Sequence, residues 1–160
     1  TIMSKGSSCN VYHDRQAHAR LIVSSFLRVT GKHLIAPNIT VDLDTALFEA
    51  EFCVLSHNDD PDPMFNYGNR AALELFELDW DELISLPSRL SAEPQRREER
   101  DRLLMEVAEK GYIDSYQGIR VSSSGKRFMV EKSIVWNLVD ELGKFRGQAA
   151  VLYEWAALAK

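Results

Sequence analysis

The last third of the sequence carries the feature that most restricts the fold, three strand-like segments joined by two short turns. Residues 112–122, 126–139 and 145–155 have the pattern of β-strands. The segments between them, SSSGK and DELGK, are short turns that contain glycine. Strands joined this tightly run antiparallel, so the sequence predicts a three-stranded antiparallel meander.

Alternation along the meander predicts a sheet with two partly apolar faces. In the middle strand, Phe128, Val130, Ile134 and Trp136 are expected to share one face, which Lys132 interrupts. The other face is mixed, and a sheet of this kind needs cover on both faces. We expect helices from the middle of the chain on one face and an N-terminal helix on the other.

The N-terminal part of the chain predicts helix. Apolar residues at helical spacing indicate an amphipathic helix over residues 12–30, and Gly31 is placed to end it. After a connector, Asp44 is expected to cap a short helix that ends at Phe48.

Between these two parts the sequence predicts short elements: strands over 51–57 and 63–68, then helices over 70–76, 80–84 and 95–110. Asn69 and Asp79 are the expected N-caps of the first two helices, and Gly111 ends the third. The third helix carries a buried stripe of Leu103, Leu104 and Val107 on an otherwise charged surface.

The element order gives an α+β fold: a five-stranded antiparallel sheet with intervening short helices and an N-terminal amphipathic helix. The length of 160 residues suits one domain. We expect a flexible leader over residues 1–10, the N-terminal helix and connector over 11–43, and the sheet domain over 44–157.

This order is that of PAS domains, and particular segments resemble them. The stretch FNYGNRAALELFELDWDELISLPS (65–88) resembles the PAS sequence of a strand, an Asn cap and two helices. GIRVSSSGKRF, VWNLVDELG and GQAA look like the MEKHLA family of PAS-related domains, a resemblance that covers residues 15–156. The resemblance implies a PAS-like fold with a regulatory or ligand-sensing role, in a family that offers no settled ligand.

The MEKHLA family includes stand-alone bacterial proteins and the C-termini of plant homeodomain-leucine zipper factors, where the domain is linked to dimerisation of its host. Neither a homeodomain nor a zipper heptad is present here, so DNA binding does not carry over from the resemblance. A net charge of −5 also disfavours a nucleic-acid partner.

Composition indicates a cytoplasmic protein with no membrane partner. No apolar run approaches the roughly 18 residues of a membrane span. The two cysteines, Cys9 and Cys53, form neither a disulfide framework nor a zinc spacing, which fits a reducing compartment.

Cofactor motifs are not found in the sequence. The helix over 95–110, the usual source of a haem ligand in PAS domains, has no His, Cys or Tyr, so haem is disfavoured. A covalent flavin adduct is disfavoured because LISLPSRLSA, the corresponding segment, has no cysteine. The cofactor therefore stays unknown, and non-covalent flavin stays open. No metal is expected, because His57 and the aspartates after it lack a calcium-loop spacing and are better interpreted as a solvated loop.

A pocket between the sheet and the middle helices is what the resemblance implies for a ligand. Aromatic and apolar residues on the facing elements are the candidate lining: Phe52, Phe65, Tyr67, Phe76, Leu104, Tyr116, Phe128 and Trp136. Polar candidates that would orient a ligand are Asn69, Tyr116, Arg120, Asn137 and Gln148. The apolar set can equally fill a core, Asn69 can serve as a cap, and Asn137 can serve a turn.

Arg120 is the most suggestive polar candidate. An inward guanidinium needs either an anionic ligand or a carboxylate partner, and Glu131 on the neighbouring strand is the alternative partner.

Three functions fit the sequence. One is a sensory domain that binds a small molecule, and the second is a protein-interaction or dimerisation module with a filled core. In the second, a homodimer forms through the N-terminal helix, with Phe26 in an apolar patch. The third is a small enzyme that uses His57 or Glu131. No nucleophile motif or catalytic constellation is present, so we do not expect an enzyme.

Overall fold

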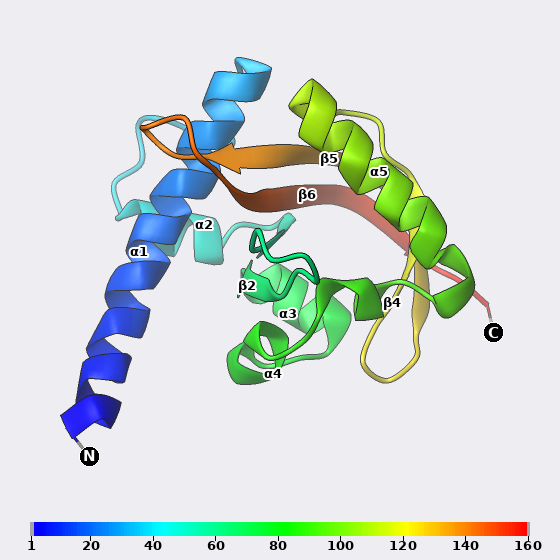
Figure 1. The fold of residues 1–160 in the computed structure, drawn as a ribbon, viewed down its shortest axis with the longest axis horizontal. Coiled ribbons are helices and arrows are strands. Elements are labelled where there is room, and N and C mark those ends of the chain that lie inside the picture. Colours follow the sequence, from blue (N-terminus) through cyan, green and yellow to red (C-terminus); the bar gives the residue numbers. More distant parts are fainter. Residues whose placement is uncertain (1, 160) are drawn as a thin grey trace.

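A sheet of six antiparallel strands divides the molecule into two layers (Figure 1). The computed structural model describes the backbone of residues 2–159 and the side chains of residues 15–159. The helices are α1 (Ile2–Thr30), α2 (Leu43–Phe48), α3 (Arg70–Phe76), α4 (Trp80–Ile84) and α5 (Arg97–Lys110). The strands are β1 (Cys53–His57), β2 (Phe65–Gly68), β3 (Tyr112–Ile113), β4 (Gly118–Val121), β5 (Arg127–Val139) and β6 (Phe145–Ala157).

The strand order is β2-β1-β6-β5-β3, and β4 pairs with β5 beside β3. The first strand of the chain, β1, and the last, β6, therefore pair with each other at the centre of the sheet. This confirms the expected α+β class and the antiparallel meander.

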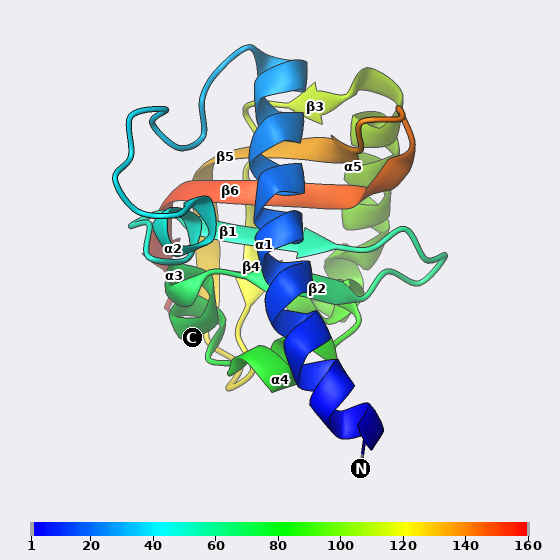
Figure 2. The ribbon, with the colours of Figure 1, turned by 90° about the vertical axis from the view of Figure 1, so that its left-hand side faces the viewer.

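The helix α1 lies across one face of the sheet, over β6, β1 and β5 (Figure 2). Ala19, Ile22 and Phe26 recur at helical spacing and are buried against the sheet. Phe26 contacts Trp136 of β5 edge to face, with ring centroids 4.8 Å apart. Backbone helix begins at Ile2 rather than at residue 12. The division into a leader, a helix with connector and a sheet domain stays a prediction.

The opposite face carries the short helix α3 and the longer α5 (Figure 1). The helix α4 lies at the β2 edge, with Leu83 in the cluster of this face and Trp80 packed against the cluster on the α1 side. The expected caps are confirmed: Asn69 accepts from the N–H of Ala72, and Asp79 forms a reciprocal capping box with Glu82. Gly111 ends α5 with φ of 95°.

The N-cap of α2 differs from the prediction. Asp42, rather than Asp44, is the N-cap and accepts from the N–H of Thr45 at 2.8 Å. Asp44 lies one residue inside the helix, where it is buried and pairs with Arg15 at 3.1 Å.

The predicted strand over 112–122 is split into β3 and β4, which raises the strand count from five to six. Both pieces pair with β5 in the same register, Tyr112 opposite Trp136 and Gly118 opposite Val130. The gap between the two pieces faces a bulge in β5 around Lys132.

The same bulge corrects the predicted faces of β5. Phe128 and Val130 pack with the middle helices, whereas Ile134 and Trp136 pack with α1. Glu131 and Lys132 are both exposed, and this extra exposed residue reverses the alternation that follows it.

Candidate functional site

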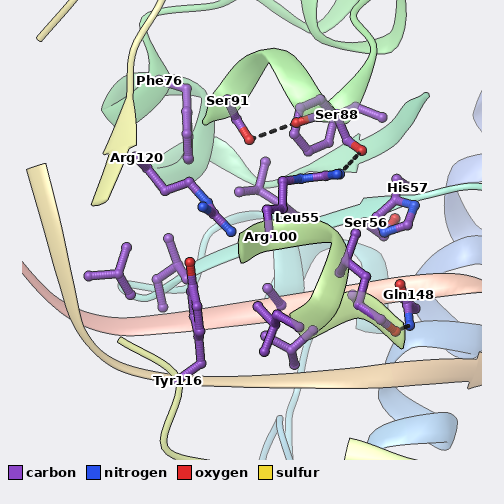
Figure 3. A pocket seen from close by; sticks show the side chains of 18 residues that line it. Leu55, Ser56, His57, Phe76, Ser88, Ser91, Arg100, Tyr116, Arg120 and Gln148 are labelled. Atoms are coloured by element: carbon purple, nitrogen blue, oxygen red, sulfur yellow. Dashed lines mark hydrogen bonds between the residues drawn. The ribbon is translucent and has the colours of Figure 1, made fainter. Parts of the chain in front are cut away.

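A cavity of about 70 Å³ lies on the sheet face opposite α1, between the sheet and α5 (Figure 3). Much of its wall is aliphatic, with Leu55, Val130, Val135 and Leu152 from the strands and Leu103 and Leu104 from α5. Flavin and haem do not fit it, since drug-sized ligands occupy pockets of about 300–1,000 Å³. Groups of only a few heavy atoms match its volume.

Half of the predicted site residues line this cavity: Phe65, Phe76, Leu104, Tyr116, Arg120 and Gln148. Tyr116 enters from the gap between β3 and β4, and its ring lies against Gly118. A side chain at Gly118 would overlap the Tyr116 hydroxyl, so the glycine allows the ring to lie there.

The other predicted residues lie elsewhere. Tyr67 and Trp136 point to the α1 face because of strand alternation and the β5 bulge. Phe52 packs against Tyr153, with ring centroids 5.5 Å apart, and Phe128 packs behind the wall against Phe76 at 5.2 Å. These four residues are part of the core rather than the cavity lining.

Asn69 is buried and holds four backbone groups. Its Oδ1 accepts from the N–H groups of Val54 and Ala72, and its Nδ2 donates to the carbonyls of Leu47 and Phe52. Both lone pairs of Oδ1 and both hydrogens of Nδ2 are thereby used. Asn69 therefore serves the fold.

Asn137 lies next to the cavity and positions one of its walls. Its Nδ2 donates to the Ala108 carbonyl at 3.3 Å, and its Oδ1 accepts from Gln148 Nε2 at 3.2 Å. The same Gln148 amide donates to the Leu104 carbonyl at 2.9 Å. This network ties the second half of α5 to β5 and β6.

Arg100 is the main cavity residue that the sequence analysis missed. It is 6% exposed, and its guanidinium donates to the Ser88 hydroxyl and to Asp101 Oδ1 at 3.3 Å. The signal was present, because Arg100 precedes Leu103, Leu104 and Val107 at the same helical spacing. The charged run EPQRREERDR around it conceals this signal, because such a run is typical of a solvated helix face.

Two guanidinium groups share the cavity. Arg100 enters from α5 and turns its guanidinium toward Ser88, whereas Arg120 enters from β4 and points toward Arg100 (Figure 3). Burial, and then the positive charge of Arg120, lower the pKa of Arg100 to about 10. Burial likewise lowers the pKa of Arg120. Asp101 and Asp62 beside Arg100, and Glu99 beside Arg120, raise these pKa values but offset the effect of burial only in part.

Carboxylates are scarce at this pair. No Asp or Glu lines the cavity within the described side chains, and Asp101, which meets Arg100, is 67% exposed. Arg120 lies over the Tyr116 ring at 5.2 Å and makes no ion pair within residues 15–159. Glu131, the alternative partner expected from the sequence, is exposed and forms no ion pair with Arg120, so that expectation was wrong.

His57 ends β1 and faces the same cavity. It is 9% exposed, and its Nδ1–H donates to the Asn58 carbonyl at 3.0 Å. Its Nε2 is buried without a hydrogen bond of ordinary geometry, because the nearby Gln148 amide donates elsewhere. Burial, followed by the charge of Arg100, lowers the pKa of His57 to about 4. The ring is therefore neutral at pH 7 and presents a bare lone pair.

The described part of the chain offers no metal-binding cluster and no reactive thiol. Residues 15–159 hold no cluster of three metal-ligating side chains. Cys53 is buried, and burial raises the pKa of its thiol to about 12, which leaves almost no thiolate. Among the helices that the structure describes, none is long and apolar enough to cross a membrane.

Solved structures with the same fold are PAS domains and light-oxygen-voltage domains. The PAS domain of a protein from Colwellia psychrerythraea superposes with a TM-score of 0.60 at 13% identity, covering 69% of this chain and 91% of that one. The fungal blue-light photoreceptor Vivid, solved as its light-state dimer, gives 0.53 at 14% identity, covering 74% and 86%. An RNA-binding light-oxygen-voltage receptor gives 0.58 at 13% identity, covering 77% and 36%.

At this level of identity these likenesses establish the fold alone. A comparison with curated proteins gives no significant match. The family assignment rests on the sequence itself, since residues 16–157 match the MEKHLA domain, nearly the whole chain. The chain belongs to the MEKHLA domain family and has the fold of PAS domains.

Proposed function

We propose that this MEKHLA domain is a sensory module that binds a small molecule in the cavity between the sheet and α5. The carrying observation is that buried polar groups converge there and are only partly paired within the protein. His57 Nε2 has no ordinary hydrogen bond, and two arginines line the cavity with no carboxylate in its wall. Buried polar and charged groups of this kind are costly unless something pairs with them.

The proposed output is α1, on the other face of the sheet. His57 and the preceding residue, Ser56, both line the cavity, and the Ser56 hydroxyl bonds His18 of α1 at 2.7 Å. Ser56 donates its own proton to Asn66 Oδ1, so His18 Nε2 donates to the serine. A displacement of β1 on ligand binding would therefore reach α1 through one residue.

The first test compares native and denaturing mass spectra of freshly purified protein, together with its absorbance spectrum. A retained mass of a few heavy atoms that denaturation removes supports a sensory role. For the output, hydrogen exchange of α1 amides is compared with and without the ligand so found. Unchanged α1 exchange in a fully liganded sample would reject α1 as the output element.

A second candidate function is a protein-interaction module, and two observations favour it. The cavity is small for a sensory ligand, and the outer side of α1 forms a groove of about 670 Å³ with the 140–143 turn. Leu27 and Leu142 are exposed there, at 38% and 93%. Such exposed apolar side chains often mark a partner surface.

Dimerisation through α1 stays a prediction, and its test needs a variant at an exposed residue of the helix. Phe26, the sequence-based choice, is 1% exposed and packs on Trp136, so Phe26→Asp would unfold the domain. Leu27→Asp is the better variant, with Leu90→Asp, equally exposed at 38% on the other side of the sheet, as the control. Sedimentation that shows the same assembly state for both variants argues against an interface on α1.

A further inference from the structure

The lining of the cavity specifies a class of ligand more closely than the proposed function does. Within the described side chains, its charged groups are Arg100 and Arg120, both cationic. Guanidinium groups pair best with planar oxyanions, and carboxylates accept two parallel N–H bonds from one guanidinium. The domain as a whole carries a net charge of −5, so this local positive charge runs against its overall balance.

Among the uncharged polar groups of the lining, His57 is the one with an unpaired buried atom, and that atom needs a hydrogen-bond donor rather than an anion. Because His57 Nδ1–H is donated to the Asn58 carbonyl, the neutral ring offers only its Nε2 lone pair to the cavity. A hydroxyl group would complement this atom, whereas a second carboxylate would repel it.

Size limits the ligand further. A cavity of about 150 Å³ holds benzene, so about 70 Å³ accommodates only a few heavy atoms. His57, Arg100 and Gln148 also line an outer cleft of about 300 Å³. Asp59, Asp60 and Asp101 line this cleft as well, so the inner cavity is the part that suits an anion. Leu55, Val130 and Leu152 supply apolar contact for one or two carbons.

We infer that the cavity binds a short hydroxy-monocarboxylate, with its carboxylate at Arg100 and Arg120 and its hydroxyl group donating to His57 Nε2. This inference rests on the proposed sensory function and names its ligand class. Glycolate and lactate are the matching probes. By the ligand-efficiency limit for very small ligands, their dissociation constants fall no lower than about 3 μM for glycolate and about 0.3 μM for lactate.

The experiment is isothermal titration calorimetry on the full chain, after dialysis into buffer free of carboxylates. Glycolate and lactate are compared with acetate and propionate, which lack the hydroxyl, and with bicarbonate. One hydrogen bond to a buried acceptor corresponds to about a tenfold change in affinity. We therefore expect glycolate and lactate to bind about tenfold more tightly than acetate and propionate.

Variants assign the two contacts separately. Arg120→Gln should abolish binding of all the acids, whereas Arg102→Gln on the exposed face of α5, at 71% exposure, should leave binding unchanged. His57→Phe should keep binding but equalise hydroxy acids and their deoxy analogues. Circular dichroism checks that each variant folds, and Arg120→Lys replaces Arg120→Gln if the latter does not fold, with weakened binding expected.

Each outcome decides between the claims. Equal affinity for glycolate and acetate, binding of bicarbonate alone, or binding that survives Arg120→Gln overturns the hydroxy-acid inference. A neutral ligand retained in native mass spectra, with no carboxylate binding up to about 50 mM, overturns it as well but leaves the sensory function standing. Failure of every probe together with no retained mass rejects both.

Discussion

Replacing Asn69 with alanine should destabilise the domain more than the loss of an ordinary helix cap. The side chain is fully buried and bonds four backbone groups at 2.8–3.1 Å. They come from three segments: Leu47 in α2, Phe52 and Val54 around β1, and Ala72 in α3. Alanine leaves both N–H groups and one or both carbonyls buried without this partner.

The size of the effect follows from these groups. Loss of a cap costs about 1 kcal/mol, and each buried backbone group left unpaired costs about 1–3 kcal/mol. Allowing for water that enters the vacated space, we expect Asn69→Ala to lower the free energy of unfolding by about 4 kcal/mol. With a urea dependence of about 2 kcal/mol per molar, the midpoint falls by about 2 M.

Urea denaturation followed by circular dichroism measures this, with Asp79→Ala as the matched control. Asp79 caps another short helix, α4, but is exposed, so its loss should cost about 1 kcal/mol. Asn69→Ser keeps a capping oxygen and loses the amide donors, and should lie between the two. If Asn69→Ala costs no more than Asp79→Ala, the four-bond account of Asn69 is wrong.

Three further predictions concern the cavity side and the core. The pKa of His57 is about 4 in the folded state and 6.5 in the unfolded state, so the unfolded state binds the proton first as the pH falls. Between pH 7 and 4.5 the free energy of unfolding of the wild type should therefore fall by about 2–3 kcal/mol more than that of His57→Phe, as measured by urea titration. Gly147→Ala should lower the free energy of unfolding by more than about 3 kcal/mol, because φ is 135° and the new Cβ would overlap the His57 carbonyl oxygen. Gly31→Ala is the control, with φ of 73° and open space around the new Cβ, and should cost about 1 kcal/mol. Phe26→Ala should cost about 3–5 kcal/mol by thermal or urea unfolding and Leu27→Ala under about 1 kcal/mol, and equal losses would contradict the placement of α1.

Local rules predicted the elements well because their signals lie within a few residues. Asn69 and Asp79 sit directly before short apolar helices, and the two glycine turns fix the meander. The element order and the PAS-like class follow from these signals. Where two acidic residues compete, as at Asp42 and Asp44, the pattern alone does not decide, because burial beside Arg15 selects the second for an ion pair.

The site was only partly predictable, since it depends on which residues meet across the sheet. Arg120 was expected to point inward, and it does line the cavity. Arg100 was concealed by the charges around it, although its spacing from Leu104 and Val107 marks the buried side of α5. His57 continues the alternation of Cys53 and Leu55, which places it on the same face as these buried residues.

The bulge of β5 explains why the predicted faces of this strand were wrong, and it also explains why the cavity exists. With strict alternation, Val130 and Trp136 would share a face, and a large indole would fill the space under α5. Because Glu131 and Lys132 are both exposed, Trp136 instead packs on Phe26 of α1. The smaller Val135 then faces the helices, and Tyr116 enters from the gap opposite the bulge. The bulge thus places the large Trp136 side chain on the α1 face rather than in the cavity, which leaves room for a small ligand within an otherwise packed domain.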